Sequence, residues 1–273
     1  MNQADAAKLK FDCLKKNLQS LGSVLIAFSG GVDSTFLAKA AHDVLGKNAI
    51  SVTATSSTYP KRELREAKRI AKQIGIRQII IESEETEIDN FSRNPKDRCY
   101  YCKKELFKKL KDVARKNGVK HILDGTNYDD MDDYRPGVRA IKEENIVSPL
   151  KDAKLTKEDI RILSKDMGLA TWDKPSCACL ASRFPYGTEI TKERLEIIDK
   201  AESIIKNIGI KQVRVRYHDN IARIEVEREF MPLLLEHSEK IIPGLKDIGF
   251  TYIAVDLEGY RTGSMNEVLK DGN

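Results

Sequence analysis

The clearest signal of the fold is the stretch Val24-Leu25-Ile26-Ala27-Phe28-Ser29-Gly30-Gly31-Val32-Asp33-Ser34. It starts with five apolar residues, a run of strand length, and passes through two glycines into a helical pattern over residues 34–45. Glycine permits positive φ and a close approach of the backbone to an anion. The amide groups and the dipole at the start of a helix attract phosphate. The stretch therefore predicts a strand, a phosphate-binding loop and a helix.

Hydroxyl and carboxylate groups complete this glycine loop. Ser29, Ser34 and Thr35 can donate hydrogen bonds to phosphate, and Asp33 can hold a magnesium ion. The sequence has neither the Gly-Lys-Ser/Thr of the common NTPase loop nor the three spaced glycines of the dinucleotide fingerprint. The alternative is a tight strand-to-helix turn in which Asp33 interacts with the helix dipole.

Strands and helices alternate through the first two thirds of the chain. A leading helix is expected over 4–20, further strands over 50–55, 78–81 and 121–124, and further helices over 60–75 and 103–116. The strands are almost continuously apolar, which is typical of a parallel sheet covered by helices on both faces. We therefore predict an α/β, doubly wound domain whose ligands lie at the carboxyl ends of the strands.

The pattern changes after residue 185. A helix is expected over 191–208, and two alternating runs, 212–217 and 221–227, flank the turn residues Asp219-Asn220 as in a hairpin. A helix over 229–247 and a strand over 252–257 follow. The sequence thus predicts two domains, 1–185 and a smaller α+β domain, 186–273. The irregular stretches 125–154 and 170–190 are long enough to be site loops.

Composition restricts the class of protein. The 273 residues are 41% apolar and 33% charged, as in a globular chain, and the formal net charge of +5 is weak support for a nucleic-acid binder. No apolar run reaches the roughly 18 residues of a membrane span. The first residues lack the pattern of a signal peptide, so we expect a cytoplasmic protein with no membrane or nucleic-acid partner.

The five cysteines are unevenly spaced. Cys13 falls in the leading helix, where a packing role is simplest. Cys99 and Cys102 form Cys-x-x-Cys between basic residues, which favour thiolate, and Cys177 and Cys179 form Cys-x-Cys. An odd count in a reducing compartment argues against a disulfide framework. Buried free cysteines and a structural zinc site remain alternatives, although Cys-x-Cys is a less usual zinc spacing.

The six residues 29–34 resemble the signature of the PP-loop ATP pyrophosphatase superfamily, at the first strand where that superfamily places it. The resemblance implies that ATP is cleaved between its α- and β-phosphates, with magnesium on Asp33. It also implies an adenine site around Ala54 and Thr55, and a ribose and phosphate side closed by the stretch Asp124-Gly125-Thr126-Asn127, which contains Gly125.

Further motifs extend the resemblance over essentially the whole chain. They are Arg98-Cys99-Tyr100-Tyr101-Cys102-Lys103, Asp133-Tyr134-Arg135-Pro136-Gly137, Ser182-Arg183-Phe184-Pro185-Tyr186-Gly187, Val213-Arg214-Val215-Arg216 and Asp256-Leu257-Glu258-Gly259-Tyr260-Arg261. They resemble the LarE family, ATP-dependent sulfur transferases of nickel-pincer nucleotide cofactor synthesis. The resemblance implies adenylylation of a carboxylate of pyridinium-3,5-biscarboxylic acid mononucleotide, conversion to a thiocarboxylate, and homo-oligomers, trimers paired into hexamers.

Family members differ in their source of sulfur. In one type a cysteine gives up its own sulfur, but that position corresponds to Ala178 here. In the other type three cysteines hold a [4Fe-4S] cluster that carries an extra sulfide. Cys99, Cys102 and Cys179 fit the second type, with Cys177 as the alternative third ligand. Thiolate ligation suits iron-sulfur clusters. The sacrificial type stays open.

Arginines are the candidate ligands of the substrate. Arg214 and Arg216 fall on one face of their strand, and paired guanidiniums suit the phosphate and carboxylate of a mononucleotide. Arg183 is a third candidate, and exposed hairpin arginines are the alternative interpretation. Tyr100 and Tyr101 either stack on the pyridinium ring or pack.

Two rival functions come from other classes. One is PP-loop tRNA thiolation, against which stand the small net charge and the lack of an appended RNA-binding module. The other is an amide-forming synthetase that uses ammonia.

Overall fold

Four parallel strands form the sheet that carries the glycine loop. The structure is a computed structural model and describes residues 3–131, 136–176 and 178–269. The sheet has the order β3-β2-β1-β4, with β1 Val24–Ala27, β2 Ala49–Thr55, β3 Arg77–Glu82 and β4 His121–Leu123. All three strand pairs are parallel, so the predicted α/β class is confirmed.

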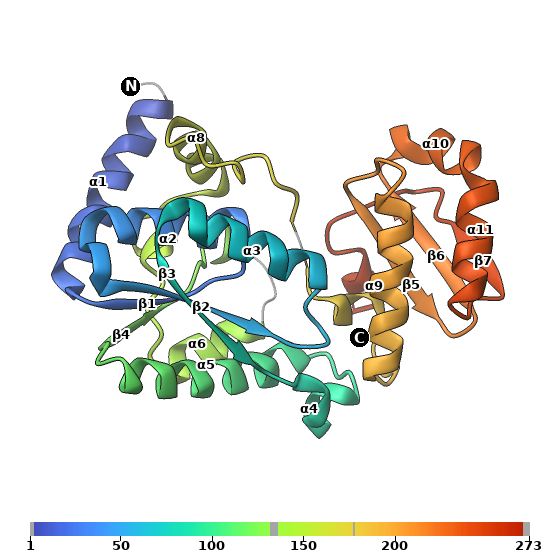
Figure 1. Ribbon diagram of the computed structural model, residues 1–273, viewed down its shortest axis with the longest axis horizontal. Helices are drawn as coiled ribbons and strands as arrows, with labels where there is room; N and C mark the ends of the chain where they lie inside the picture. The colour runs from blue at the N-terminus through green and yellow to red at the C-terminus, as the bar shows by residue number, and fades with distance from the viewer. Residues whose placement is uncertain (1–2, 132–135, 177, 270–273) are drawn as a thin grey trace. The chain divides into compact units, whose positions relative to one another are not determined.

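Helices cover both faces of this sheet (Figure 1). One face bears α1 Gln3–Leu21, α2 Val32–Leu45, α3 Lys61–Ile74 and α8 Lys157–Asp166; the other bears α5 Arg98–Lys116 and α6 Gly137–Glu143. Within β1, Val24 and Ile26 belong to the core on the first face and Leu25 to the core on the second. Burial on both faces explains why the strand is continuously apolar.

Several elements differ from the sequence expectations. Helix α5 begins at Arg98, five residues before the expected start, and so includes the Cys-x-x-Cys pair. The stretch 125–154 contains α6 and the short α7 Pro149–Asp152. Helix α8, which was not expected from the sequence, begins with a capping box in which Thr156 and Asp159 exchange hydrogen bonds.

A smaller mixed sheet forms the second part of the chain. Strands β5 Val213–His218 and β6 Ile221–Val226 pair antiparallel, which confirms the predicted hairpin, and β7 Tyr252–Val255 pairs parallel to β6. The helices here are α9 Lys192–Lys206, α10 Met231–Glu236 and α11 Ser238–Asp247. The single helix expected over 229–247 is therefore two helices, which meet at His237.

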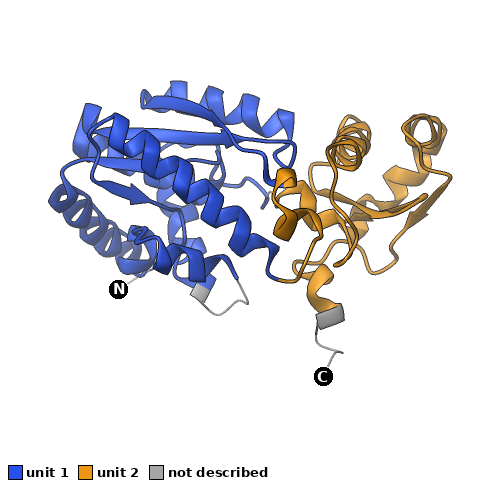
Figure 2. Ribbon diagram, turned by 90° about the horizontal axis from the view of Figure 1, so that it is seen from below, with its two compact units in different colours: residues 1–85, 97–177 blue, residues 86–96, 178–273 orange. Residues whose placement is uncertain are grey.

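The chain divides into two compact units, coloured separately in Figure 2. The first comprises residues 1–85 and 97–177, the second residues 86–96 and 178–273. The segment 86–96, with α4 Asp89–Ser92, belongs to the second unit because the Asn94 amide donates to the carbonyls of Phe184 and Pro185. No described helix is long and apolar enough to cross a membrane.

Candidate active site

The glycine loop joins β1 to α2 and uses its two glycines differently. Gly30 has φ +68°, and a Cβ there would lie 3.0 Å from Cα and Cβ of Ala67 in α3. Only glycine satisfies both conditions. Gly31 has φ −80°, so the expectation of positive φ fits Gly30 and not Gly31, which acts as the N-cap residue of α2.

Internal hydrogen bonds give the loop its shape. The Ser29 and Ser34 hydroxyl oxygens lie 3.0 Å apart, and Ser34 Oγ also donates to the Gly31 carbonyl. From outside the loop, the Tyr59 hydroxyl donates to the Ser29 carbonyl at 2.6 Å, and Lys174 Nζ donates to the Gly30 carbonyl at 3.0 Å. Tyr59 and Lys174 lie 30 and 144 residues from their partners in sequence, and no sequence motif marked either of them.

Asp33 lies in the first turn of α2 with two partners from distant segments. Lys157 Nζ, at the start of α8, forms an ion pair with its carboxylate, and Asn127 Nδ2 lies 3.5 Å from its Oδ1. The Lys157 backbone amide donates to Asp129 at 2.7 Å, which anchors this end of α8. Lys157 is thus a further residue near the loop that was not predicted from the sequence.

The stretch after β4 lies beside the start of α2. A Cβ at Gly125 would lie 3.2 Å from the Ser34 backbone nitrogen, so glycine allows a close approach to the start of α2. Asp124 is held by hydrogen bonds from Thr126 Oγ1 at 2.5 Å and Ser148 Oγ at 2.6 Å. These contacts orient its carboxylate at the carboxyl end of the sheet.

A cavity of about 280 Å³ opens between the glycine loop, the end of β4 and α5. Its walls include Ala27, Ser29, Gly31, Asp33, Ser34, Lys103, Leu106, Phe107, Asp124, Gly125, Thr126 and Asp130. The cavity therefore lies at the carboxyl ends of parallel strands, where ligands of such sheets bind. Ala54 and Thr55, the expected adenine contacts, are half-buried at the end of β2.

Helix α5, which lines part of this cavity, also carries Cys99 and Cys102. Cys99 is exposed and Cys102 half-buried, both in the first five residues of α5. One face of the helix carries residues at the spacing i, i+3, i+4, i+7 and i+8. These are Cys99, Cys102, Lys103, Leu106 and Phe107. Lys103, Leu106 and Phe107 line the cavity. The cysteines thus continue the lining face about one turn, roughly 5 Å, toward the start of the helix.

The tyrosines between the cysteines pack inside the unit. Tyr100 is buried, and its hydroxyl donates to Glu143 Oε2 at 2.6 Å, which lowers the pKa of that carboxyl. The Arg139 guanidinium stacks 3.7 Å from the Tyr100 ring centre. Tyr101 lies edge-on to Tyr100 at 5.2 Å. Of the two expectations for Tyr100, the structure shows packing.

In the second unit, Arg183 is buried deeply. It is 1% exposed and pairs through Nε and NH2 with both oxygens of Glu202, at 2.7 and 3.0 Å. Its NH1 donates to the carbonyls of Ala178 and Cys179. Burial raises the pKa of Glu202, but Arg183 and Lys206 outweigh burial and hold it below its ordinary value. Arg183 thus fastens the backbone that carries Cys179, whose own side chain is exposed. Cys177 lies outside the described residues.

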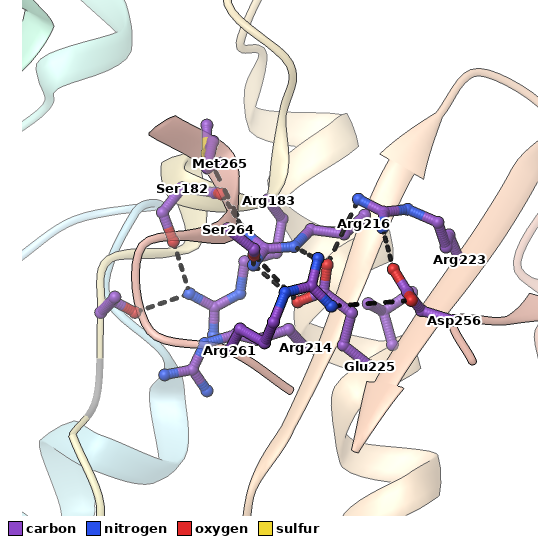
Figure 3. Close-up of polar contacts among 12 residues, drawn as sticks. Ser182, Arg183, Arg214, Arg216, Arg223, Glu225, Asp256, Arg261, Ser264 and Met265 are labelled. Carbon is purple, nitrogen blue, oxygen red and sulfur yellow. Dashed lines mark hydrogen bonds and ion pairs between the residues drawn. The ribbon is translucent and has the colours of Figure 1, made fainter. Parts of the chain in front are cut away.

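Arg214 and Arg216 lie on β5 and are both buried. Figure 3 shows the polar contacts around them. Arg216 pairs with both oxygens of Glu225 at 2.9 and 2.7 Å, and also donates to the Ser182 carbonyl and Ser264 Oγ. The Arg214 guanidinium lies 5.2 Å from the Tyr260 ring centre. The alternative of exposed hairpin arginines is therefore wrong.

The described residues do not bring a set of metal ligands together. Residues 3–131, 136–176 and 178–269 contain no three His, Cys, Asp or Glu side chains close enough together to hold a metal ion. Cys99 and Cys102 belong to the first unit and Cys179 to the second.

Comparison with known proteins places this site in a family. A family model described as NAD synthase matches residues 7–118, which contain the glycine loop and α5. The chain is 37% identical over 253 residues to pyridinium-3,5-bisthiocarboxylic acid mononucleotide synthase of Lactiplantibacillus plantarum, covering 92% of each chain. The chain belongs to the LarE family.

Two further relatives match the LarE-family chain over nearly its whole length. An uncharacterized protein of Synechocystis sp. is 42% identical over 262 residues, covering 95% of this chain and 98% of its own. An uncharacterized protein of Methanocaldococcus jannaschii is 33% identical over 252 residues, covering 91% of this chain and 96% of its own. This LarE-family chain is accordingly a nucleotide-binding PP-loop enzyme, a sulfurtransferase by family.

Proposed function

We propose that the chain adenylylates a carboxylate of pyridinium-3,5-biscarboxylic acid mononucleotide and converts it to a thiocarboxylate. A carboxylate oxygen attacks the α-phosphorus of ATP, and the bond from that phosphorus to the bridging oxygen breaks, which releases pyrophosphate. A sulfur nucleophile then attacks the acyl carbon, and AMP leaves with the acyl oxygen. The Lactiplantibacillus plantarum relative at 37% identity, named for the bisthiocarboxylic acid product, supports this substrate.

The observation that carries the proposal is the shared face of α5. Lys103, Leu106 and Phe107 line the cavity beside the glycine loop, and Cys99 and Cys102 continue the same helix face. A nucleotide cavity and a pair of thiols on one helix suit a reaction that first forms an acyl adenylate and then adds sulfur.

The ATP side uses the glycine loop. We propose that Ser29, Gly30, Gly31 and Ser34 bind the phosphates, that Ala54 and Thr55 contact adenine, and that Gly125 lets the end of β4 approach the nucleotide. Asp33 would hold magnesium, because a carboxylate beside a phosphate site offers the hard oxygen ligand this ion prefers. Asp33, Ser34 and Gly125 line one cavity, which supports the loop and the end of β4 as phosphate contacts; Ala54 and Thr55 do not line it.

The substrate side uses the second unit. We propose that Arg214 and Arg216 bind the phosphate and carboxylate of the mononucleotide. Burial, Arg223 and Arg216 together lower the pKa of His218 on the same strand. The contacts of Arg183 with Glu202 and with the carbonyls of Ala178 and Cys179 support a positioning role beside Cys179.

For the sulfur source we propose a [4Fe-4S] cluster held by Cys99, Cys102 and Cys179, with Cys177 as the alternative third ligand. Thiolates are the ligands of such clusters. Cys99 and Cys179 are exposed, and Cys99 and Cys102 lie three residues apart on one face of α5. When bound, such a cluster would supply an extra sulfide for transfer. The sacrificial alternative uses one cysteine as the donor and needs no cluster.

The test is pyrophosphate release from ATP with three acceptors. We expect release with pyridinium-3,5-biscarboxylic acid mononucleotide, followed by a thiocarboxylate product when sulfide is supplied anaerobically. Unmodified tRNA should give no release, in line with a net charge of +5. Release with tRNA alone would support the thiolation rival. An amide product with ammonium would support the amide-forming rival.

Assembly is part of the proposal. We propose trimers paired into hexamers, as the family resemblance implies, and light scattering after size exclusion gives the oligomeric mass. A monomer at micromolar concentration would contradict it.

A further inference from the structure

Lys103 brings a positive charge to the cavity beside the glycine loop. Among the described residues that line this cavity, it is the only basic one, and Asp33, Asp124 and Asp130 are the acidic ones. It comes directly after Cys102 and lies four residues, one helix turn, beyond Cys99. A cation in this place faces the site where phosphate charge accumulates.

The ammonium group of Lys103 is loosely held. Its Nζ lies 3.6 Å from Asp124 Oδ2, longer than a hydrogen bond, and its side chain is 35% exposed. Asp124, in contrast, accepts short hydrogen bonds from Thr126 and Ser148. The carboxylate is thus fixed by its own neighbours, whereas the N–H groups of Lys103 remain available to phosphate oxygens.

Gly137 makes room for the stem of this lysine. A Cβ at Gly137, the first residue of α6, would lie 2.8 Å from Lys103 Cδ and 3.1 Å from its Cε. Gly137 does not have a positive φ, so its backbone conformation does not require glycine. The close approach of Lys103 does explain it. Even an alanine would force the lysine stem to shift.

We propose that Lys103 is a catalytic residue of adenylylation that contacts the α-phosphate of ATP, and that Gly137 positions it. The choice of the α-phosphate rests on the proposed function. Sulfur from the α5 cysteines must reach the acyl carbon, which is bonded through oxygen to the α-phosphorus. Lys103 lines the cavity and directly follows Cys102. It therefore lies closest to the α-phosphate of the bound triphosphate. Its charge stabilises the negative charge that develops when pyrophosphate leaves.

Three lysine variants test the contact. For Lys103→Met we expect kcat for pyrophosphate release to fall about 10²- to 10³-fold, as for the loss of one transition-state donor. Calorimetric ATP affinity should fall about tenfold, because a charge-assisted hydrogen bond is lost. Lys103→Arg should recover part of kcat. The matched control is Lys108→Met, on the same helix but exposed and off the lining face, which should match the wild type.

A double-mutant cycle tests the role of Gly137. Gly137→Ala alone should lower kcat about 10- to 100-fold by displacing Lys103. In the Lys103→Met background it should have no further effect, because the displaced group is already gone. A loss of similar size in both backgrounds would show that Gly137 acts through the fold and would overturn its assignment. Melting temperatures of all variants identify any general destabilisation.

The outcomes separate this inference from the proposed function. Wild-type kcat in Lys103→Met, or a raised KM with unchanged kcat, would overturn the catalytic role. If the wild type releases no pyrophosphate with the mononucleotide, the proposed function fails. ATP affinity still tests the phosphate contact: loss in Lys103→Met supports it, and wild-type affinity overturns it.

Discussion

Three segments of the chain meet at the carboxylate of Asp33. It lies in the first turn of α2, pairs with Lys157 of α8 and lies beside Asn127 after β4. The ion pair is partly exposed, 40% for Lys157 and 23% for Asp33, so it contributes little to stability. The charge of Asp33 is therefore not needed for the fold, and removing it tests the proposed magnesium site.

Replacing Asp33 with asparagine should abolish most adenylylation. The variant loses the charge that would hold magnesium against pyrophosphate, so the rate of pyrophosphate release should fall about 10²-fold or more. The melting temperature should stay near that of the wild type. Asp43→Asn is the matched control, because Asp43 lies in the same helix and also pairs with a lysine, Lys39. An unchanged rate of pyrophosphate release in Asp33→Asn would contradict the assignment of magnesium to Asp33.

Arg214 is the arginine best suited to a test of substrate binding. Removing Arg216 would leave the fully buried Glu225 without its bidentate partner, so lost binding and lost stability would be confounded. Arg214 stacks near Tyr260 and donates to the Val213 carbonyl.

Arg214→Ala should weaken binding of the mononucleotide by about 1.5–3 kcal/mol, the worth of a hydrogen bond to a charged group. AMP affinity should stay unchanged, because AMP would bind in the first unit. Isothermal calorimetry measures both. Arg194→Ala is a matched control, since Arg194 also lies near a tyrosine ring and donates to a backbone carbonyl. An equal loss of AMP affinity in Arg214→Ala would contradict the assignment.

At the scale of elements, the Arg183–Glu202 pair joins a loop, a helix and a strand. Arg183 belongs to the 3-10 turn Leu180–Arg183, Glu202 to α9, and the Val215 amide of β5 donates to Glu202. Both side chains are almost fully buried. A buried charge that loses its partner is costly, so the three elements depend on both residues.

Glu202→Gln should destabilise the second unit by about 3–5 kcal/mol, because Arg183 is left buried without a countercharge. The pair also predicts acid sensitivity. The pKa of Glu202 is held below its ordinary 4.5, so its contribution to stability is present above pH 4.5 and is lost as the pH falls through the lowered value. Hydrogen exchange of residues 213–218 measures both effects. Glu87→Gln, which breaks the exposed Lys192–Glu87 pair, should change neither.

The elements themselves were largely predictable. Every strand of both sheets was expected within a few residues, because apolar runs and alternation follow burial directly. The start of α5 was not predicted, because Arg98, Cys99 and Lys103 show no helical spacing of apolar residues and resemble a loop. The broken helix near His237 was missed because both halves continue one amphipathic pattern.

At the scale of the whole molecule, the sulfur source decides whether the enzyme turns over. With Cys99, Cys102 and Cys179 as cluster ligands, each Cys→Ala variant should lose bound iron and sulfur transfer together but keep adenylylation. Cys13→Ala should keep all three, since Cys13 lies on α1. Iron and sulfide counts after anaerobic purification measure the first loss. Intact mass before and after turnover separates the alternatives: an unchanged mass agrees with the cluster, and loss of one hydrogen sulfide at a cysteine contradicts it.

Local patterns and short motifs were enough to predict the α/β class, the glycine turn from strand to helix, the hairpin and the family, because each is expressed within a few neighbouring residues. Which side chains meet depends on the tertiary structure. Lys157 reaches Asp33 across 124 residues, Lys174 reaches Gly30 across 144, and Gly137 leaves space for Lys103. Folding also buries Arg183, Arg214 and Arg216 instead of displaying them on a surface. Such contacts join residues far apart in the chain, and no local pattern encodes the distance between them.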